Sequence, residues 1–413
     1  MPTYVKRHAP IDMNPDKYSS PAIRPADLIL YLFGHRAAIE RVAATRHAWL
    51  VGAILVLTAG IARNYDHLDL LRQPQWFLGP FAASLVSIGF IFMWISGPLR
   101  LHKAGRYWKQ LGTFLVLAWL TAPCAWLYAI PVESMTDIVT ATKWNIAFLA
   151  IVAFWRVAII VRAISVLTEV SWLRALPLVL APAALEAMLG SLYQGLSLVG
   201  IMGGIRLPPH TQLLVEAANF TTSVSFCLFI ALFIATFFFK GIALKPLFRP
   251  ASSASRVMVP TVIFIFLAWV AVAIPLLPQI TNRYRLQQML DERDYSGAIT
   301  FASGKTRRDF PRHHYLPPEP FQTFPSELLD QLPLDAPAWL REEWINGAIE
   351  SLTTSDEYQS EEWRNTALRY PEIPIAMARH AEELRNRSAP LSDDEAHWLR
   401  NHESSDEPPA STP

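Results

Sequence analysis

Apolar residues form long unbroken runs in the middle of the chain, while both ends are charged. A helix that crosses about 30 Å of hydrocarbon needs roughly 20 apolar residues. The runs that meet or approach this length are residues 47–62, 76–95, 111–130, 144–161, 172–203, 223–239 and 257–277. This pattern predicts an all-α protein, a polytopic transmembrane helical bundle of about seven spans in a lipid bilayer.

The same pattern divides the chain into four parts. Residues 1–46 are an N-terminal segment, and 47–278 form the transmembrane bundle. Residues 279–387 are a polar tail, and the acidic, Ser/Pro-rich 388–413 is predicted to be disordered. Within the N-terminal segment, Pro25 to Ala44 mixes apolar and basic residues on a helical period, which predicts an interfacial helix lying along the membrane surface.

The distribution of Lys and Arg predicts the orientation. Cytoplasmic connections carry an excess of basic residues. That excess is found in the N-terminal segment and in connections 100–109, 162–174 and 240–256, whereas the alternate connections hold few. We therefore expect a multi-pass protein of the cell membrane with a cytoplasmic N-terminus and an extracytoplasmic tail. Loss of one weak span would instead place the tail in the cytoplasm.

The fifth apolar run is too long for one straight span and is interrupted by Pro177, Pro182 and several glycines. One interpretation is a single helix kinked by proline, because Gly and Pro are common in membrane helices. The other is a broken helix that lines a polar cavity, as in many transporters. The sequence leaves both interpretations open.

Two ionisable residues interrupt the central runs. Arg156 lies about six residues, roughly 9 Å, from the cytoplasmic end of the fourth run, and Glu186 lies about 14 residues into the fifth. Arg156 either extends to the headgroups or pairs with Glu186. The expected depth difference is on the order of 10 Å, so pairing requires the fifth span to kink or tilt.

A second polar group lies at the start of the sixth span. Glu216, Asn219 and Ser223 recur at helical spacing and form one stripe. If the helix begins well before this stripe, we expect it to face the bundle and line an entry vestibule with Tyr193 and Gln194. If the helix begins later, these residues are ordinary solvated positions.

Charge and motifs exclude several functional classes. The 36 Lys and Arg balance 35 Asp and Glu, for a net charge of +1, which argues against nucleic-acid binding. The two cysteines, Cys124 and Cys227, lie in apolar runs and form neither a disulfide framework nor a metal site. No zinc-protease, phosphate-loop, nucleophile-elbow or dinucleotide motif occurs. We therefore expect a non-enzymatic protein without a cofactor.

The tail combines predicted helices with a proline-rich loop. Arg285 to Phe301 predicts a helical hairpin whose ERDYSGAI core resembles a single tetratricopeptide-type repeat, although no second copy is visible. Asp309 to Pro337 is rich in proline, and 336–350 and 361–387 again predict helices. A solenoid and a short helical pair on the membrane-proximal surface both remain open. We expect the tail to contact partner proteins.

Asp27 to Arg63, DLILYLFGHRAAIERVAATRHAWLVGAILVLTAGIAR, resembles the entry into the membrane region of bacterial Yip1-like proteins. The resemblance covers about a tenth of the chain and implies a non-enzymatic role in membrane organisation. It carries over no functional residue. This chain departs from that family by its predicted seven spans in place of five and by its long tail.

The sequence thus supports two functional hypotheses. The first is a scaffold or assembly protein of a bacterial membrane, acting through its tail. The alternative is a small-solute transporter or channel that uses a broken fifth span. The oligomeric state is left open, with a homo-oligomer among the possibilities.

Overall fold

A computed structural model describes residues 24–45, 48–65, 75–97, 107–199, 209–237, 258–311, 324–354, 363, 366, 369–385 and 399. Regular structure in these residues is helical, and they contain no β-strand. The predicted all-α membrane fold is therefore confirmed. The predicted disorder of residues 388–413 lies outside the described residues, except that Leu399 packs against the apolar core of the tail.

Among the described residues, six helical segments are long and apolar enough to cross a membrane, and α3 (Ala48–Asn64) is a shorter apolar helix. Together they agree with the prediction of about seven spans. These long segments lie within six stretches of helix. They are α4 (Gln75–Ser96), α5 (Tyr107–Trp119) with η2 (Ala122–Ala129) and η3 (Val132–Ser134), α6 (Ile138–Thr168), α7 (Trp172–Val199), α8 (Pro209–Phe237), and α9 (Met258–Ala273) with η4 (Ile274–Leu276) and α10 (Leu277–Asp291).

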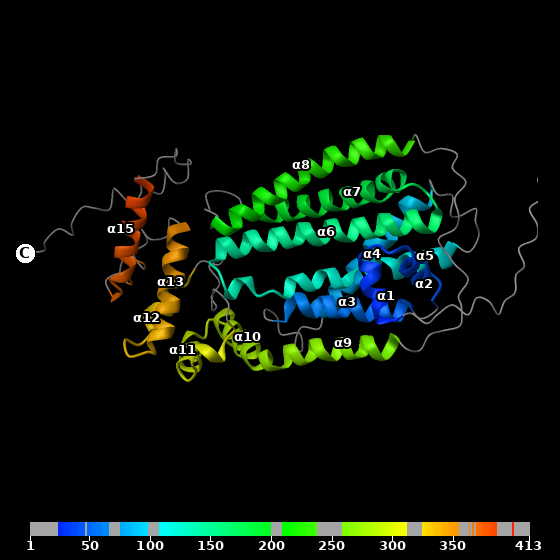
Figure 1. The fold of residues 1–413 in the computed structure, drawn as a ribbon. Coiled ribbons are helices and arrows are strands. Elements are labelled where there is room, and N and C mark those ends of the chain that lie inside the picture. The colour runs from blue at the N-terminus through cyan, green and yellow to red at the C-terminus, as the bar shows by residue number, and fades with distance from the viewer. Residues whose placement is uncertain are drawn as a thin grey trace, which may run out of the picture.

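The spans form one bundle (Figure 1), and among the described residues every span except α8 contributes to one apolar core. Helix α3 contacts α4, α5, η2 and α9, while α6, α7 and α8 lie side by side. Helices α1 (Pro25–Leu32) and α2 (Arg36–Ala43) lie at one end of the bundle, and the helices that follow α9 lie at the other. This placement requires an odd number of crossings between them, as the charge distribution predicts.

The third span is interrupted inside its apolar run. Pro123 has no backbone N–H to donate to the Trp119 carbonyl, so α5 ends at Trp119. The amide of Thr121 donates instead to the Ala118 carbonyl at 3.1 Å, and the chain continues as the 3₁₀ helix η2. The Leu117 carbonyl thereby loses its usual partner, the amide four residues later.

The fifth span, in contrast, is not broken over the residues that the structure describes. Helix α7 continues from Trp172 to Val199 through Pro177 and Pro182. Neighbouring helices can satisfy the backbone groups that proline frees in a membrane. The interruption that the sequence suggested for the fifth span lies in the third instead, and residues 200–203 of the predicted run are outside the described part.

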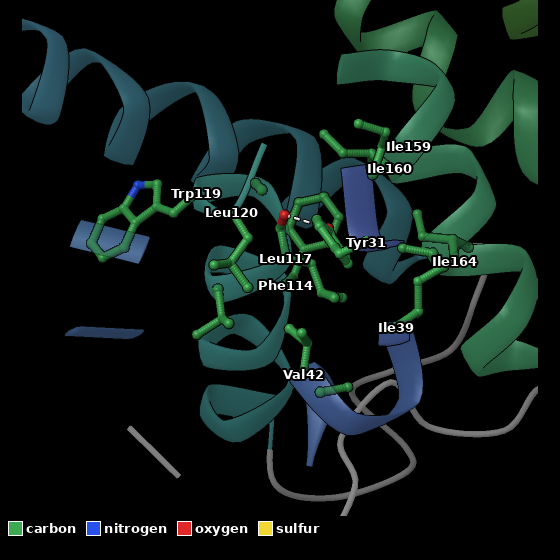
Figure 2. Packing of buried hydrophobic residues seen from close by; sticks show 14 of the residues in the cluster. Tyr31, Ile39, Val42, Phe114, Leu117, Trp119, Leu120, Ile159, Ile160 and Ile164 are labelled. Carbon is green, nitrogen blue, oxygen red and sulfur yellow. Dashed lines mark hydrogen bonds between the residues drawn. The ribbon is translucent and has the colours of Figure 1, made fainter. Parts of the chain in front are cut away.

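The N-terminal segment forms two helices where the sequence predicts one. Gly34 adopts a left-handed backbone conformation with φ of +71°, which ends α1 and turns the chain into α2. Tyr31 of α1 is fully buried, and its hydroxyl donates to the Leu117 carbonyl at 2.5 Å. Figure 2 shows this ring among apolar side chains of α2, α5 and α6. The predicted interfacial helix is therefore a docked helical pair.

Other polar contacts hold this pair in place. The Trp155 indole N–H donates to the Leu32 carbonyl at 2.8 Å, and Arg162 Nε donates to the Gly34 carbonyl at 3.2 Å. Buried Asp27 pairs with Arg41 of α2. On the other side of α1, Ile29 and Phe33 are 61% and 75% exposed. Helix α1 thus has an inner face fixed to the bundle and an apolar outer face.

The tail has an apolar core of its own. Its helices are α10, α11 (Tyr295–Ser303), the short η5 (Arg307–Asp309), α12 (Ser326–Gln331), α13 (Ala338–Thr354) and α15 (Glu372–Arg385). The residues at its centre include Trp344, Leu340 and Tyr370. Phe310 and Phe324, which come before and after the undescribed part of the proline-rich loop, are also buried in this core. The tail is therefore a packed helical unit, not an isolated helical pair.

The tail helices follow one another in series. Helix α10 packs on α11, α11 on α12, α12 on α13, and α13 on α15. Asp294 caps α11 by accepting a hydrogen bond from the Gly297 amide at 2.9 Å, which fixes the turn of the first hairpin. Contacts between successive elements are typical of stacked helical hairpins, in which each pair buries the face of the next.

Replacing Tyr31 by Phe tests the link between α1 and the interrupted span. The Leu117 carbonyl would be left buried without its donor, so we expect the free energy of unfolding to fall by about 1–3 kcal/mol. Thermal unfolding of the full chain in detergent measures the change. Tyr193→Phe is the matched control, because Tyr193 is 75% exposed. Equal effects of the two substitutions would contradict the assigned role of the hydrogen bond.

Acid should weaken the docking of α1 on α2. Burial acts to raise the pKa of Asp27, but hydrogen bonds from the Arg41 side chain and the Arg24 amide, with the charges of both residues, lower it overall. A lowered pKa gives stability that is present above the unfolded-state value of about 3.9 and is lost as the pH falls through the folded-state value.

Asp27→Asn should therefore destabilise the protein near pH 7, and its difference from wild type should shrink below about pH 4. Thermal unfolding between pH 7 and about pH 3 measures this difference. Glu216→Gln is the control, because Glu216 is exposed and lies away from this pair. A difference for Asp27→Asn that stays constant over the whole range would show that the ion pair does not stabilise the docked helices.

Candidate functional site

The interruption of the third span forms the centre of a polar site inside the bundle. Thr121, at the break, is fully buried. Its hydroxyl donates to the Ala118 carbonyl at 2.6 Å and accepts a hydrogen bond from Arg156 Nε of α6 at 3.0 Å. Arg156 therefore lies beside the C-terminal end of α5, where the partial negative charge of the last carbonyls favours a cation.

Arg156 and Glu186 lie at nearly the same depth. Helix α6 continues to Thr168, so Arg156 is 12 residues, about 18 Å, before its end. Glu186 is 14 residues, about 21 Å, from the start of α7, and a short turn joins the two helices. The depth difference of order 10 Å expected from the sequence was wrong, because the fourth span is longer than its apolar run.

Helix α4 supplies the third side of the site. The Ser87 hydroxyl donates to Glu186 Oε2 at 2.6 Å, so Glu186 is held between α4 and α7. Arg156 and Glu186 attract each other through space but form no direct ion pair. The hypothesis that these residues pair is supported only as an electrostatic interaction without direct contact.

Several hydrogen-bonding groups of these two side chains are unused. Within the described part of the chain, Arg156 forms one hydrogen bond, to Thr121, and Glu186 forms one, from Ser87. A guanidinium has five N–H donors and a carboxylate has two acceptor oxygens. Four donors and one carboxylate oxygen are thus left for water or a small molecule.

Two residues of η2 extend the polar region. Cys124 and Tyr128 lie within electrostatic range of Arg156, and Tyr128 is also within range of Arg63 near the end of α3. Arg63 belongs to the end of the bundle that faces the tail. Polar side chains therefore continue from the interior pair toward that end. Sequence reasoning missed Ser87, Thr121 and Tyr128, although Pro123 marked the break.

The other predicted polar residues do not join this site. Glu216 and Asn219 are exposed on α8, where Glu216 accepts a hydrogen bond from Gln212 at 3.3 Å. Tyr193 is exposed on α7, and the side chain of Gln194 lies outside the described part. Helix α8 does begin before the stripe, at Pro209. The stripe is nevertheless exposed, so within the described part of the chain it does not line a vestibule.

The described residues hold no group of three or more His, Cys, Asp or Glu side chains suited to a metal ion. No protein-family model, curated protein or solved structure matches the chain. The resemblance of Asp27 to Arg63 to Yip1-like proteins therefore stays a prediction. What is established is a multi-pass membrane fold with an interior polar site at an interrupted span.

The interaction between Arg156 and Glu186 is measurable by a double-mutant cycle. Each single change, Arg156→Gln or Glu186→Gln, leaves one charge in the bundle without its opposite. We expect the double variant to be more stable than additivity predicts, by about 0.5–3 kcal/mol. Thermal unfolding in detergent gives the three values. The control cycle pairs Arg156→Gln with Glu216→Gln, which should be additive, and an additive main cycle would argue against coupling.

Proposed function

We propose that this protein is a non-catalytic membrane scaffold in a bacterial cell membrane, whose multi-span bundle anchors the tail and whose tail contacts partner proteins. The observation that carries the proposal is the separate core of the tail, built around Trp344 and Tyr370 and distinct from the core of the bundle. A membrane anchor alone does not require a second packed unit. Serially packed helices present extended surfaces that commonly bind proteins.

The arrangement of the two ends supports the proposed orientation. Helices α1 and α2 and the tail lie at opposite ends of the bundle (Figure 1). The N-terminal segment is rich in Lys and Arg, which favours the cytoplasmic side. In this proposal the tail therefore meets its partners outside the cytoplasm. Leu334 and Ile375 are exposed apolar side chains of the tail and are candidate contact points.

Trp344→Ala in the full chain tests the scaffold. Truncating this buried side chain should cost the tail about 3–5 kcal/mol and expose it to protease, with the bundle still inserted. We expect proteins that crosslink to the wild-type chain in intact membranes to be lost from this variant. Trp108→Ala is the matched control, because Trp108 of α5 is 77% exposed. Crosslinked partners that persist when the tail is unfolded would refute the scaffold.

A second candidate function is the binding and passage of a small solute. The specific observation in its favour is that Arg156 is bonded to Thr121 at the interrupted span, while Glu186, which attracts it electrostatically, is bonded to Ser87 of α4. Ionisable residues within a bundle commonly mark solute or proton pathways. Interrupted spans commonly form the binding sites of transporters. This candidate uses the third span in place of the fifth.

A further inference from the structure

The polar site contains one positive and one negative group that do not neutralise each other by contact. Arg156 Nε donates to Thr121, and Glu186 Oε2 accepts from Ser87. The other nitrogen atoms of the guanidinium and the other carboxylate oxygen form no hydrogen bond with the described residues, and we call these unused atoms the free edges. A charge in a bundle interior is costly unless it is paired and hydrogen-bonded. The free edges therefore favour an occupant with hydrogen-bonding groups for both.

The charges of the site determine which occupant costs least. Arg156 and Glu186 have opposite charges that sum to zero, and they attract each other without direct contact. A simple anion or cation would leave one net charge in a low-dielectric interior. A molecule with one positive and one negative group would keep the total at zero and would give each protein charge an opposite neighbour.

The geometry of the two groups sets the direction of binding. The unused guanidinium N–H groups of Arg156 match the two oxygens of a carboxylate. The free oxygen of Glu186 accepts a hydrogen bond from an ammonium. From these features we infer that Arg156 and Glu186 form a binding site for a small zwitterion of the α-amino-acid class, with its carboxylate on Arg156 and its ammonium on Glu186. The inference rests on the second candidate function, solute binding.

Binding to the full chain in lipid nanodiscs tests the inference. The probes are two matched sets: alanine, propionate and ethylamine, and leucine, 4-methylpentanoate and 3-methylbutylamine. Within each set the ions lack one charged group of the zwitterion. We expect at least one zwitterion to raise the thermal unfolding midpoint of the wild type, and its matched ions to leave it unchanged at the same concentration.

Substitutions assign the binding to the site. Arg156→Gln and Glu186→Gln should each weaken zwitterion binding by about tenfold or more, because each removes one of the two charged contacts. Arg156→Lys keeps the charge but loses the two-pronged geometry, so we expect an intermediate affinity. Glu216→Gln, on the exposed face of α8, should bind like wild type.

Several outcomes would overturn the inference. They are a wild-type protein that binds neither zwitterion, an anion that binds as well as its zwitterion, and a Glu186→Gln variant that binds unchanged. Proteoliposome uptake separates this result from the second candidate function: a zwitterion that binds without uptake removes transport and keeps the site. Uptake of other solutes without zwitterion binding removes the site and keeps transport.

Discussion

The structure depends on satisfying one backbone carbonyl in the middle of a membrane span. Because of Pro123, α5 ends at Trp119, four residues before the proline. The Leu117 carbonyl thereby loses its helical donor. Lipid offers no hydrogen bond to replace it. The Tyr31 hydroxyl donates the missing hydrogen bond to this carbonyl. The Tyr31 ring, with buried residues of α1 and α2, packs in the apolar core (Figure 2). The interruption and the docked N-terminal pair are therefore one feature of the fold.

The polar interior of the bundle lies at the same interruption. Buried Thr121, at the break, accepts a hydrogen bond from Arg156 Nε. One short turn joins the end of α6 to the start of α7, so Arg156 and Glu186 lie at similar depths in the bundle. Ser87 of α4 donates a hydrogen bond to the Glu186 carboxylate. The interrupted third span, α4, α6 and α7 thus all contribute side chains to this polar site. The tail, with its separate core, takes no part in this arrangement.

The sequence predicts the membrane fold well because span length and apolarity follow directly from the thickness of the bilayer. Local backbone features were harder to assign. Pro177 and Pro182 left open whether the fifth span is one helix or broken, and α7 is one helix over the described residues, while the single Pro123 interrupts the third span. Arg156 was recognised as a candidate, but its depth was misjudged because α6 extends beyond its apolar run. The face of the Glu216 stripe depends on packing around α8, which helical spacing alone does not specify.

The contact between Tyr31 and Leu117 joins residues 86 positions apart, with Tyr31 the earlier of the two. During synthesis α1 and α2 leave the ribosome before their binding site exists. The helical pair must wait at the membrane surface, held there by Ile29 and Phe33, until the third span has been inserted. Closure of the N-terminal end of the bundle is consequently a late step of biogenesis, although the residues that perform it are among the first to be translated.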